Sequence, residues 1–227
     1  MLTLILATAN KHKVEEIRAI LGDGFRIRSM ADLPGVVVPD ETSDSFGGNA
    51  LIKAVELAAW LAEQRFGVDD TTAILADDSG LEVTALAGAP GVQSARFAAL
   101  DDGRPGNSPD AENSAKLLRL MDVLPKATRA ARFRCVLALA PCARLEDIGA
   151  EDSLRGVLAS HTQFFEGTCE GEIAQRPSGG GGFGYDPLFI PKGFQKTMAE
   201  LSPEEKNRIS HRAKALGKLV SALTQQP

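Results

Sequence analysis

Two neighbouring carboxylates, Asp77 and Asp78, close an apolar stretch that reads TTAILADDSGLEV over residues 71–83. Carboxylates in such a place are poor core residues, but they serve well as Mg²⁺ ligands or as bases. Side chains alternate between the faces of a strand, so we expect only one of the pair to face a reaction site. Glu41, in the segment PDETSDSF, could supply a further carboxylate. The competing interpretations are an Asx-turn before Gly80 and a solvated Glu41.

A second set of polar residues follows the first apolar run, in the segment ATANKHK. If this segment joins a strand to a helix, its backbone N–H groups and the helix dipole suit an anionic phosphate. Thr8, Asn10 and Lys13 would add two donors and a cation. Alternatively, Asn10 only caps the helix and the lysines are solvated. The chain contains no GxxxxGK[ST] pattern, so this turn is not a P-loop.

The segment SGGGGFGYDP, residues 178–187, combines five glycines with two aromatic residues and a carboxylate. We reject a dinucleotide-binding GxGxxG loop here, because no clear strand precedes it and Pro187 stands where a helix should begin. Glycines let the backbone approach closely, and beside Phe183 and Tyr185 they predict a pocket for a flat aromatic ligand stacked on a ring. The alternative is a glycine hairpin whose aromatic side chains belong to the core.

Four hydrogen-bond donors, Lys206, Ser210, His211 and Arg212, lie within the segment EEKNRISHRAKA. At about 100° per residue, Lys206 and Ser210 share a helix face while the other two point away from it. One straight helix therefore cannot aim all four at one ligand. Either the cluster is a solvated helix face, or the helix breaks near Ile209 and Ser210 caps a second helix whose first turn faces the ligand.

The elements that position these residues follow from hydrophobic periodicity. We expect strands over residues 2–7, from 71 to the carboxylate pair with a tight turn after it, and over 131–140 and 162–174. Helices are expected after Asn10 and over 48–66, 111–124 and 202–223, the last opened by a capping box of Ser202 and Glu205. Residues 99–113 contain many turn formers and predict a mobile loop. This alternation indicates an α/β protein with a mixed sheet.

Composition limits the class of protein. The chain has 227 residues, 44% of them hydrophobic, which is enough for one sizeable domain. A net charge of −5 lacks the basic excess that binding to a nucleic acid normally requires. Three widely spaced cysteines without a CxxC pattern suggest neither a zinc site nor a disulfide framework. The N-terminal apolar run is too short for a signal sequence or a membrane span, so we expect a cytoplasmic protein.

Together these segments resemble the inosine triphosphate pyrophosphatase family, also called XTP/dITP diphosphatases. The matching pieces, in chain order, are LILATANKHKVEEI, FGGNALIKA, ILADDSGLEV, GAPGVQSARFA, GGFGYDPLF and AELSPEEKNRISHRAKAL. DDSGL, GFGYDP and SHRAKAL at these distances are specific as a combination, and the match covers nearly the whole chain. The resemblance implies an elongated mixed sheet with flanking helices, a single domain (residues 1–227) of two lobes around a nucleotide cleft, and a homodimer.

The resemblance also implies an activity and a role for each matching residue. The family hydrolyses non-standard purine nucleoside triphosphates (ITP, dITP and XTP) to the monophosphate and pyrophosphate. Asp78 matches the catalytic aspartate, and Glu41 and Asp78 match the residues that bind Mg²⁺. Phe183 matches the ring that stacks on the base. The full set of expected substrate-binding residues is Thr8, Asn10, Lys13, Lys53, Ser79, Phe183, Tyr185, Asp186, Lys206, Ser210, His211 and Arg212.

One departure from the family pattern concerns the metal. Bacterial relatives mostly have Glu-Asn-Ala where this chain has Gly48-Asn49-Ala50, so a metal ligand is lost if that glutamate coordinates Mg²⁺. Two other classes of function stay open: a pyrophosphatase for modified pyrimidine nucleotides, and a protein that binds nucleotides without hydrolysing them. We expect neither a nucleic-acid partner nor a membrane partner.

Overall fold

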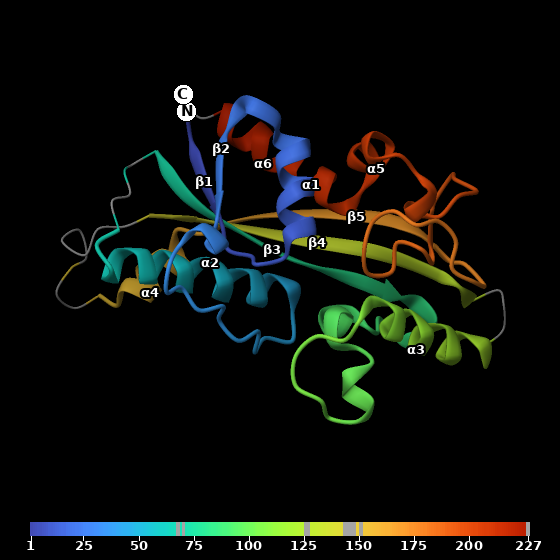
Figure 1. The fold of residues 1–227 in the computed structure, drawn as a ribbon. Helices are drawn as coiled ribbons and strands as arrows, with labels where there is room; N and C mark the ends of the chain where they lie inside the picture. Colours follow the sequence, from blue (N-terminus) through green and yellow to red (C-terminus); the bar gives the residue numbers. More distant parts are fainter. Residues whose placement is uncertain (67–68, 70, 125–127, 143–148, 150–151, 226–227) are drawn as a thin grey trace. The chain divides into compact units, whose positions relative to one another are not determined.

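The computed structural model describes residues 1–66, 69, 71–124, 128–142, 149 and 152–225. Its sheet has six strands in the order β2-β1-β3-β4-β5-β6 (Figure 1). β1 pairs in parallel with both β2 and β3, whereas β6 pairs antiparallel to β5. The sheet is therefore mixed, and the predicted α/β class is confirmed. The strands are β1 (Thr3–Leu6), β2 (Arg26–Ser29), β3 (Thr72–Val83), β4 (Ala130–Pro141), β5 (Gln163–Ile173) and β6 (Phe189–Pro191).

Six α-helices flank the sheet in the described part of the chain: three match predicted segments, and two others share the fourth predicted segment. They are α1 (Lys11–Leu21), α2 (Phe46–Glu63), α3 (Asp110–Asp122), α4 (Leu154–Ser160), α5 (Pro203–Ile209) and α6 (His211–Thr224). Short 3₁₀ turns include Gly91–Arg96, Ala99–Asp101 and Met198–Glu200. Residues 99–113, expected to be a mobile loop, contain one of these turns and the start of α3.

The chain divides into two compact units, each assembled from separate segments. The first unit comprises Met1–Asp78, Val136–Glu166 and Ala215–Pro227, and the second comprises Ser79–Cys135 and Gly167–Lys214. The expectation of a single domain of two lobes stays a prediction.

The first unit has a core built by α2 and the adjoining strands. Ala50, Ala54, Leu57, Ala58 and Leu61, spaced as an amphipathic helix requires, are all buried there. Burying one leucine side chain stabilises a fold by about 2 kcal/mol, so this face of α2 is a principal source of stability for the unit. In Figure 1, α2 and α4 cover one face of the sheet, and α1 and α6 cover the other.

The core of the second unit is rich in aromatic side chains. Phe133 of β4 and Phe189 of β6 meet edge to face, with ring centroids 4.7 Å apart. Leu81, Leu117 and Leu188 complete the centre of this cluster with no solvent exposure. Because the glycine-rich segment runs directly into Tyr185, Leu188 and Phe189, this core anchors its C-terminal end.

Two expected elements differ in the structure. The strand that was expected to stop at the carboxylate pair continues as β3 through Ser79 and Gly80 to Val83, so both the tight turn and the Asx-turn are wrong. The strand can continue because lysine side chains pair with both buried carboxylates. The helix expected over 202–223 is two helices, α5 and α6, with Ser210 between them. The break agrees with the second of the two alternatives given for this segment.

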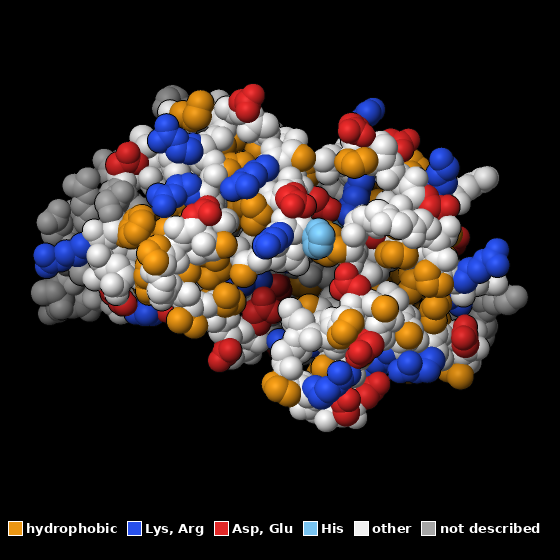
Figure 2. All heavy atoms as spheres, viewed as in Figure 1, with side chains coloured by type: hydrophobic (Ala, Val, Ile, Leu, Met, Phe, Trp, Pro, Cys, Tyr) orange, Lys and Arg blue, Asp and Glu red, His pale blue; other side chains and the backbone are white. Residues whose placement is uncertain are grey.

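Basic and acidic side chains are interspersed with apolar and uncharged ones over the described part of the face drawn in Figure 2. None of the helices in the described residues combines the length and apolar character needed to cross a membrane.

Candidate active site

In the first unit, the turn between β1 and α1 is organised by Asn10. Its Oδ1 accepts hydrogen bonds from the backbone N–H groups of His12 (3.0 Å) and Lys13 (3.2 Å), and Thr8 Oγ1 accepts from the N–H of Asn10. Asn10 is therefore the N-cap of α1, as the structural alternative for this segment required. Lys13 is not solvated: its Nζ lies 2.6 Å from Asp77 Oδ1.

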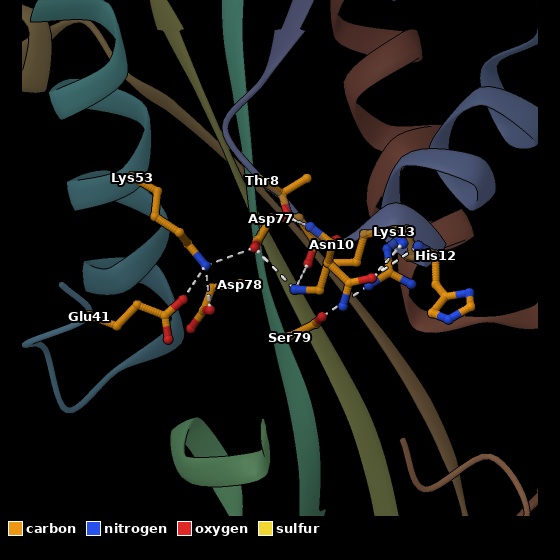
Figure 3. A network of polar contacts seen from close by, with 10 residues as sticks. Thr8, Asn10, His12, Lys13, Glu41, Lys53, Asp77, Asp78 and Ser79 are labelled. Carbon is orange, nitrogen blue, oxygen red and sulfur yellow. Dashed lines mark hydrogen bonds and ion pairs between the residues drawn. The ribbon is translucent and has the colours of Figure 1, made fainter. Parts of the chain in front are cut away.

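Lys53, on α2, gathers three acceptors around one ammonium group (Figure 3). Its Nζ lies 2.9 Å from Glu41 Oε1, 2.7 Å from Asp78 Oδ1 and 2.9 Å from the carbonyl oxygen of Asp77. Burial alone would lower the pKa of Lys53, but the carboxylates of Asp78 and Glu41 outweigh it and raise the pKa above its ordinary value. The ammonium is therefore a fixed positive charge at neutral pH.

The two aspartates point to opposite sides of β3, as strand geometry predicts. Asp77 pairs with Lys13 of α1, and Asp78 pairs with Lys53 of α2. The carbonyl oxygen of Asp77 accepts from both lysines, at 3.2 Å and 2.9 Å. Burial raises the pKa of the Asp78 carboxyl, and Lys53 and Lys13 oppose that shift. The site thus brings together two cations and three carboxylates from four segments of the first unit.

Sequence reasoning left open whether Asp77 shares the role of Asp78 and did not predict its contact with Lys13, although a signal for that contact was available. β1 and β3 are parallel neighbours with Leu6 opposite Leu75, so the residues that follow β1 and the carboxylates in the middle of β3 approach the same region of the sheet. Lys13 in the first turn of α1 could therefore have been paired with Asp77.

The donor set of this cluster fits the predicted Mg²⁺. Glu41 and Asp78 carboxylate oxygens both lie within hydrogen-bond distance of one ammonium nitrogen, so the two side chains converge on a single cationic centre. Within the described residues, no three Asp, Glu, His or Cys side chains form a metal-binding group. Mg²⁺ tolerates this, because it is usually bound by one or two carboxylates together with waters and substrate phosphates.

Gly48 occupies a position with no space for a side chain. A Cβ atom there would lie 2.0 Å from Ser43 Oγ and 3.0 Å from Ser45 Oγ. Ser45 caps α2 by accepting the N–H of Gly48, and Asn49 Oδ1 accepts the N–H of Ser43 at 2.9 Å. Ser43 therefore fills the space beside Gly48, and α2 holds the Glu41 segment both through Asn49 and through Lys53.

In the second unit, Asp186 organises the glycine-rich segment. Its Oδ2 accepts the N–H of Phe183 at 2.9 Å and pairs with Lys206 Nζ at 2.5 Å. Gly182 has a φ of +72°, and a Cβ there would lie 2.1 Å from Asp186 Oδ2, so only glycine fits. The expected substrate-binding residue Asp186 is thus buried and engaged with protein groups.

Phe183 and Tyr185 lie in different surroundings. The half-buried Phe183 ring has Lys206 Nζ 5.1 Å and the Arg212 guanidinium carbon 5.8 Å from its centroid, which is the range of cation–π contact. Tyr185 is buried in the core and its hydroxyl donates to the carbonyl of Ser94 at 2.9 Å. The core-aromatic alternative therefore describes Tyr185, whereas Phe183 keeps an exposed part that a ligand could reach.

The break between α5 and α6 determines the directions of the remaining donors, Ser210, His211 and Arg212. Ser210 Oγ accepts the N–H of Ala213 at 3.1 Å, so it caps α6. Arg212 is 1% exposed, and its Nη2 donates to Ser79 Oγ at 3.0 Å. His211 stacks on Phe133 with a centroid distance of 4.8 Å. Lys206 and Arg212 thus meet at Phe183 from two helices, which a single straight helix would prevent.

The sequence matches a known protein family over nearly its whole length. The Ham1 family model matches residues 4–222, and the chain belongs to that family. The family resemblance predicted from the sequence motifs is confirmed.

Among curated relatives, the dITP/XTP pyrophosphatase of Desulforamulus reducens is 44% identical over 224 residues, which are 98% of this chain and 96% of the relative. The enzyme of the same name from Geobacillus kaustophilus is 43% identical over 96% and 93% of the two chains. The solved Ham1 protein of Coxiella burnetii is 36% identical, with a TM-score of 0.74 over 99% of this chain and 100% of that one.

Proposed function

We propose that this protein hydrolyses non-standard purine nucleoside triphosphates, namely ITP, dITP and XTP, to the nucleoside monophosphate and pyrophosphate. Such an activity removes deaminated purines from the nucleotide pool before they enter DNA or RNA. The relatives named dITP/XTP pyrophosphatase support the reaction and its substrate class. The main structural support is the half-buried Phe183 ring flanked by the buried cations Lys206 and Arg212, which suits a purine that carries an oxygen at C6.

In this proposal, the first unit supplies the partners of the triphosphate. Lys13 and Lys53 neutralise phosphate charge, with Thr8 and Asn10 as further polar contacts, and Ser79, the first residue of the second unit, would add another. Glu41 and Asp78 would hold Mg²⁺, which polarises phosphate oxygens when it is bound.

Asp78 acts as the base in the hydrolytic step. Its carboxylate takes a proton from a water molecule while the water oxygen forms a bond to the α-phosphorus. The bond between that phosphorus and the bridging oxygen breaks, and pyrophosphate leaves with the bonding electrons. A base suits this place because burial raises the pKa of Asp78 toward the working pH.

The second unit would select the base by its hydrogen-bonding pattern. Hypoxanthine and xanthine present an accepting oxygen at C6, whereas adenine presents an amino donor. Lys206 and Arg212 carry only donors, and His211 can donate, so they match the oxygen and oppose the amino group. A buried polar group left unpaired costs about 1–3 kcal/mol, so several such mismatches give strong discrimination against ATP.

We further propose a cytoplasmic homodimer that acts on free nucleotides and engages neither a nucleic acid nor a membrane. The net charge of −5 and the dispersed charges of Figure 2 are in keeping with a small-molecule substrate.

A product assay tests the proposed function. The protein is incubated with Mg²⁺ and, separately, ITP, XTP, ATP and GTP, and monophosphate, diphosphate, pyrophosphate and orthophosphate are quantified. We expect monophosphate and pyrophosphate from ITP and XTP only. Asp78→Asn should reduce turnover by at least about a thousandfold while the nucleotide still binds. Release of orthophosphate with diphosphate, or no release at all, would contradict the proposal.

A further inference from the structure

The orientation of the Phe183 ring depends on a backbone that glycines leave free to move. Gly179, Gly182 and Gly184 all have positive φ, and residues 179–182 are all glycine, so no side chain packs immediately before Phe183. Its first part is fixed by the N–H of Ser178, which donates to Pro187 O at 2.9 Å, and by the N–H of Gly181, which donates to Ala199 O at 3.1 Å. These contacts lie before Phe183 and leave its own peptide groups to be fixed by others.

Two carboxylates from different elements hold the peptide N–H groups of Phe183 and Gly184, and the carbonyl oxygen of Phe183 accepts the N–H of Asp186 at 3.2 Å. Asp186 accepts the N–H of Phe183, and Asp110 Oδ2 accepts the N–H of Gly184 at 2.6 Å. Hydrogen bonds to an ionised acceptor are roughly twice as strong as neutral ones. The first bond comes from within the segment itself, three residues on, whereas the second comes from a residue 74 positions away in the sequence.

Asp110 is carried by a helix that is itself rigidly attached. It is the first residue of α3, and Asn113, one turn further, accepts the N–H of Ala98 at 2.8 Å and donates to Ala95 O at 3.1 Å. Ser94, next to Ala95, accepts the hydroxyl of Tyr185. The start of α3 and the end of the glycine-rich segment therefore both contact the same turn, residues 91–96. The hydrogen bond between Asp110 and Gly184 joins these two segments to each other directly.

We propose that Asp110 is a positioning residue for the base-stacking ring: by holding the N–H of Gly184 it fixes Phe183 in the orientation that receives the purine. This inference rests on the proposed function and extends it to residues 99–113, which would deliver Asp110 to the glycine-rich segment. Asp110 itself touches no substrate. Its loss should therefore weaken binding of the base and leave the phosphate partners in the first unit unchanged.

The experiment separates the two parts of the nucleotide. Dissociation constants for inosine monophosphate and for pyrophosphate are measured by calorimetry on Asp110→Ala, Asp110→Asn and wild type, together with kcat and KM for ITP. For Asp110→Ala we expect binding of the monophosphate to weaken and KM to rise by about tenfold, with pyrophosphate binding and kcat within about twofold of wild type. Asp110→Asn keeps an accepting oxygen and should recover most of the affinity.

Glu112→Ala is the matched control. Glu112 also places a negative charge in the first turn of α3, but its carboxylate pairs with the exposed Arg104. It should behave as wild type. Equal weakening by Glu112→Ala would assign the effect to helix charge, and equal weakening of pyrophosphate and monophosphate would assign it to general damage. Either result would overturn the positioning role, as would wild-type affinity in Asp110→Ala.

A second readout separates this inference from the proposed function. Amide hydrogen exchange at Gly184, measured without nucleotide, should be faster in Asp110→Ala than in wild type and Glu112→Ala. Unchanged exchange would refute the contact itself. If wild type neither binds inosine monophosphate nor hydrolyses ITP, the proposed function fails, and the exchange rate still decides whether Asp110 holds the segment.

Discussion

At the scale of single residues, Gly48 shows how a departure from a family pattern is accommodated locally. The resemblance indicated that a glutamate is missing at this position, and with it a metal ligand if that glutamate coordinates Mg²⁺. In the structure, the space beside Gly48 is filled by Ser43, whose hydroxyl also accepts the N–H of Ser45. The glycine and the serine therefore form a complementary pair, and a larger residue at position 48 requires a change at position 43.

This pair gives a stability prediction whose sign is unusual. Glycine to alanine within a helix ordinarily stabilises by about 0.5–1 kcal/mol. Gly48→Ala should instead destabilise the protein by about 1–2 kcal/mol, because its Cβ would meet Ser43 Oγ at 2.0 Å. In a Ser43→Gly background the same change should become neutral or stabilising. Urea denaturation of the four proteins of this double-mutant cycle measures the coupling.

Gly47→Ala is the control for that cycle. Gly47 is the neighbouring helical glycine and has open space around its Cβ position, so alanine there should be neutral or stabilising in either background. Additive effects of Gly48→Ala and Ser43→Gly would show that the two positions do not interact.

At the scale of elements, the break between α5 and α6 decides where the base-reading residues point. Ser210 ends α5 by donating its N–H to Lys206 O and starts α6 through its hydroxyl. Ser210 alone therefore separates the two helices. The break lets Lys206 of α5 and Arg212 of α6 both approach the Phe183 ring.

Ser210→Ala tests the value of this cap. Loss of a serine N-cap typically costs about 1 kcal/mol, so we expect that loss in the free energy of unfolding, together with a raised KM for ITP because His211 and Arg212 lie in the first turn of α6. Ser221→Ala, on the same helix, removes an exposed hydroxyl that only bonds back to Gly217 O. It should change neither quantity, and an equal effect of both variants would deny Ser210 its capping role.

The elements also show what the sequence could predict. Periodicity placed α1, α2, α3, β4 and β5 correctly within a few residues, because each has one apolar face or run. It failed at β3, where Asp77 and Asp78 resemble a strand end. The carboxylates stay within the strand because Lys13 and Lys53, 64 and 25 residues away, neutralise them, and no local pattern records such a contact.

The candidate site was predictable to a similar degree. The sequence motifs identified Asp78, Phe183 and Arg212 as candidate site residues, because a motif consists of residue types and their order, and both can be read from the sequence. They could not reveal that Asp186 and Tyr185 use their polar atoms on Lys206 and Ser94, because those partners come from distant segments. Asp110 belongs to none of the motifs, and it lies next to the glycine-rich segment only in the folded chain.

At the scale of the whole molecule, the reactivity of the three cysteine thiols measures how well solvent is excluded from the interior. Cys135 and Cys169 are buried, Cys142 is half-buried, and none of the three forms a disulfide. Burial raises the pKa of Cys142 to about 12, and burial also raises the pKa of Cys169.

Thiol labelling tests this description. Only a thiolate reacts rapidly, and a pKa of about 12 leaves roughly one molecule in ten thousand ionised at pH 8. Ellman's reagent should therefore label the native protein very slowly at pH 8 and label three thiols after denaturation. The rate at Cys142 should rise about tenfold per pH unit between pH 8 and 10, because the thiolate fraction grows by that factor below the pKa. Rapid labelling of one thiol at pH 8 would contradict the burial of that cysteine.

The division of the chain into interleaved segments has a consequence for how the protein folds. Because the first unit needs Met1–Asp78, Val136–Glu166 and Ala215–Pro227, it cannot be completed until the third of these segments has left the ribosome. β1 must also pair with β3 across about 65 intervening residues, a non-local contact of the kind that slows folding. The nascent chain therefore carries exposed apolar strands for most of its synthesis, and chaperone dependence during translation is the expected cost of this topology.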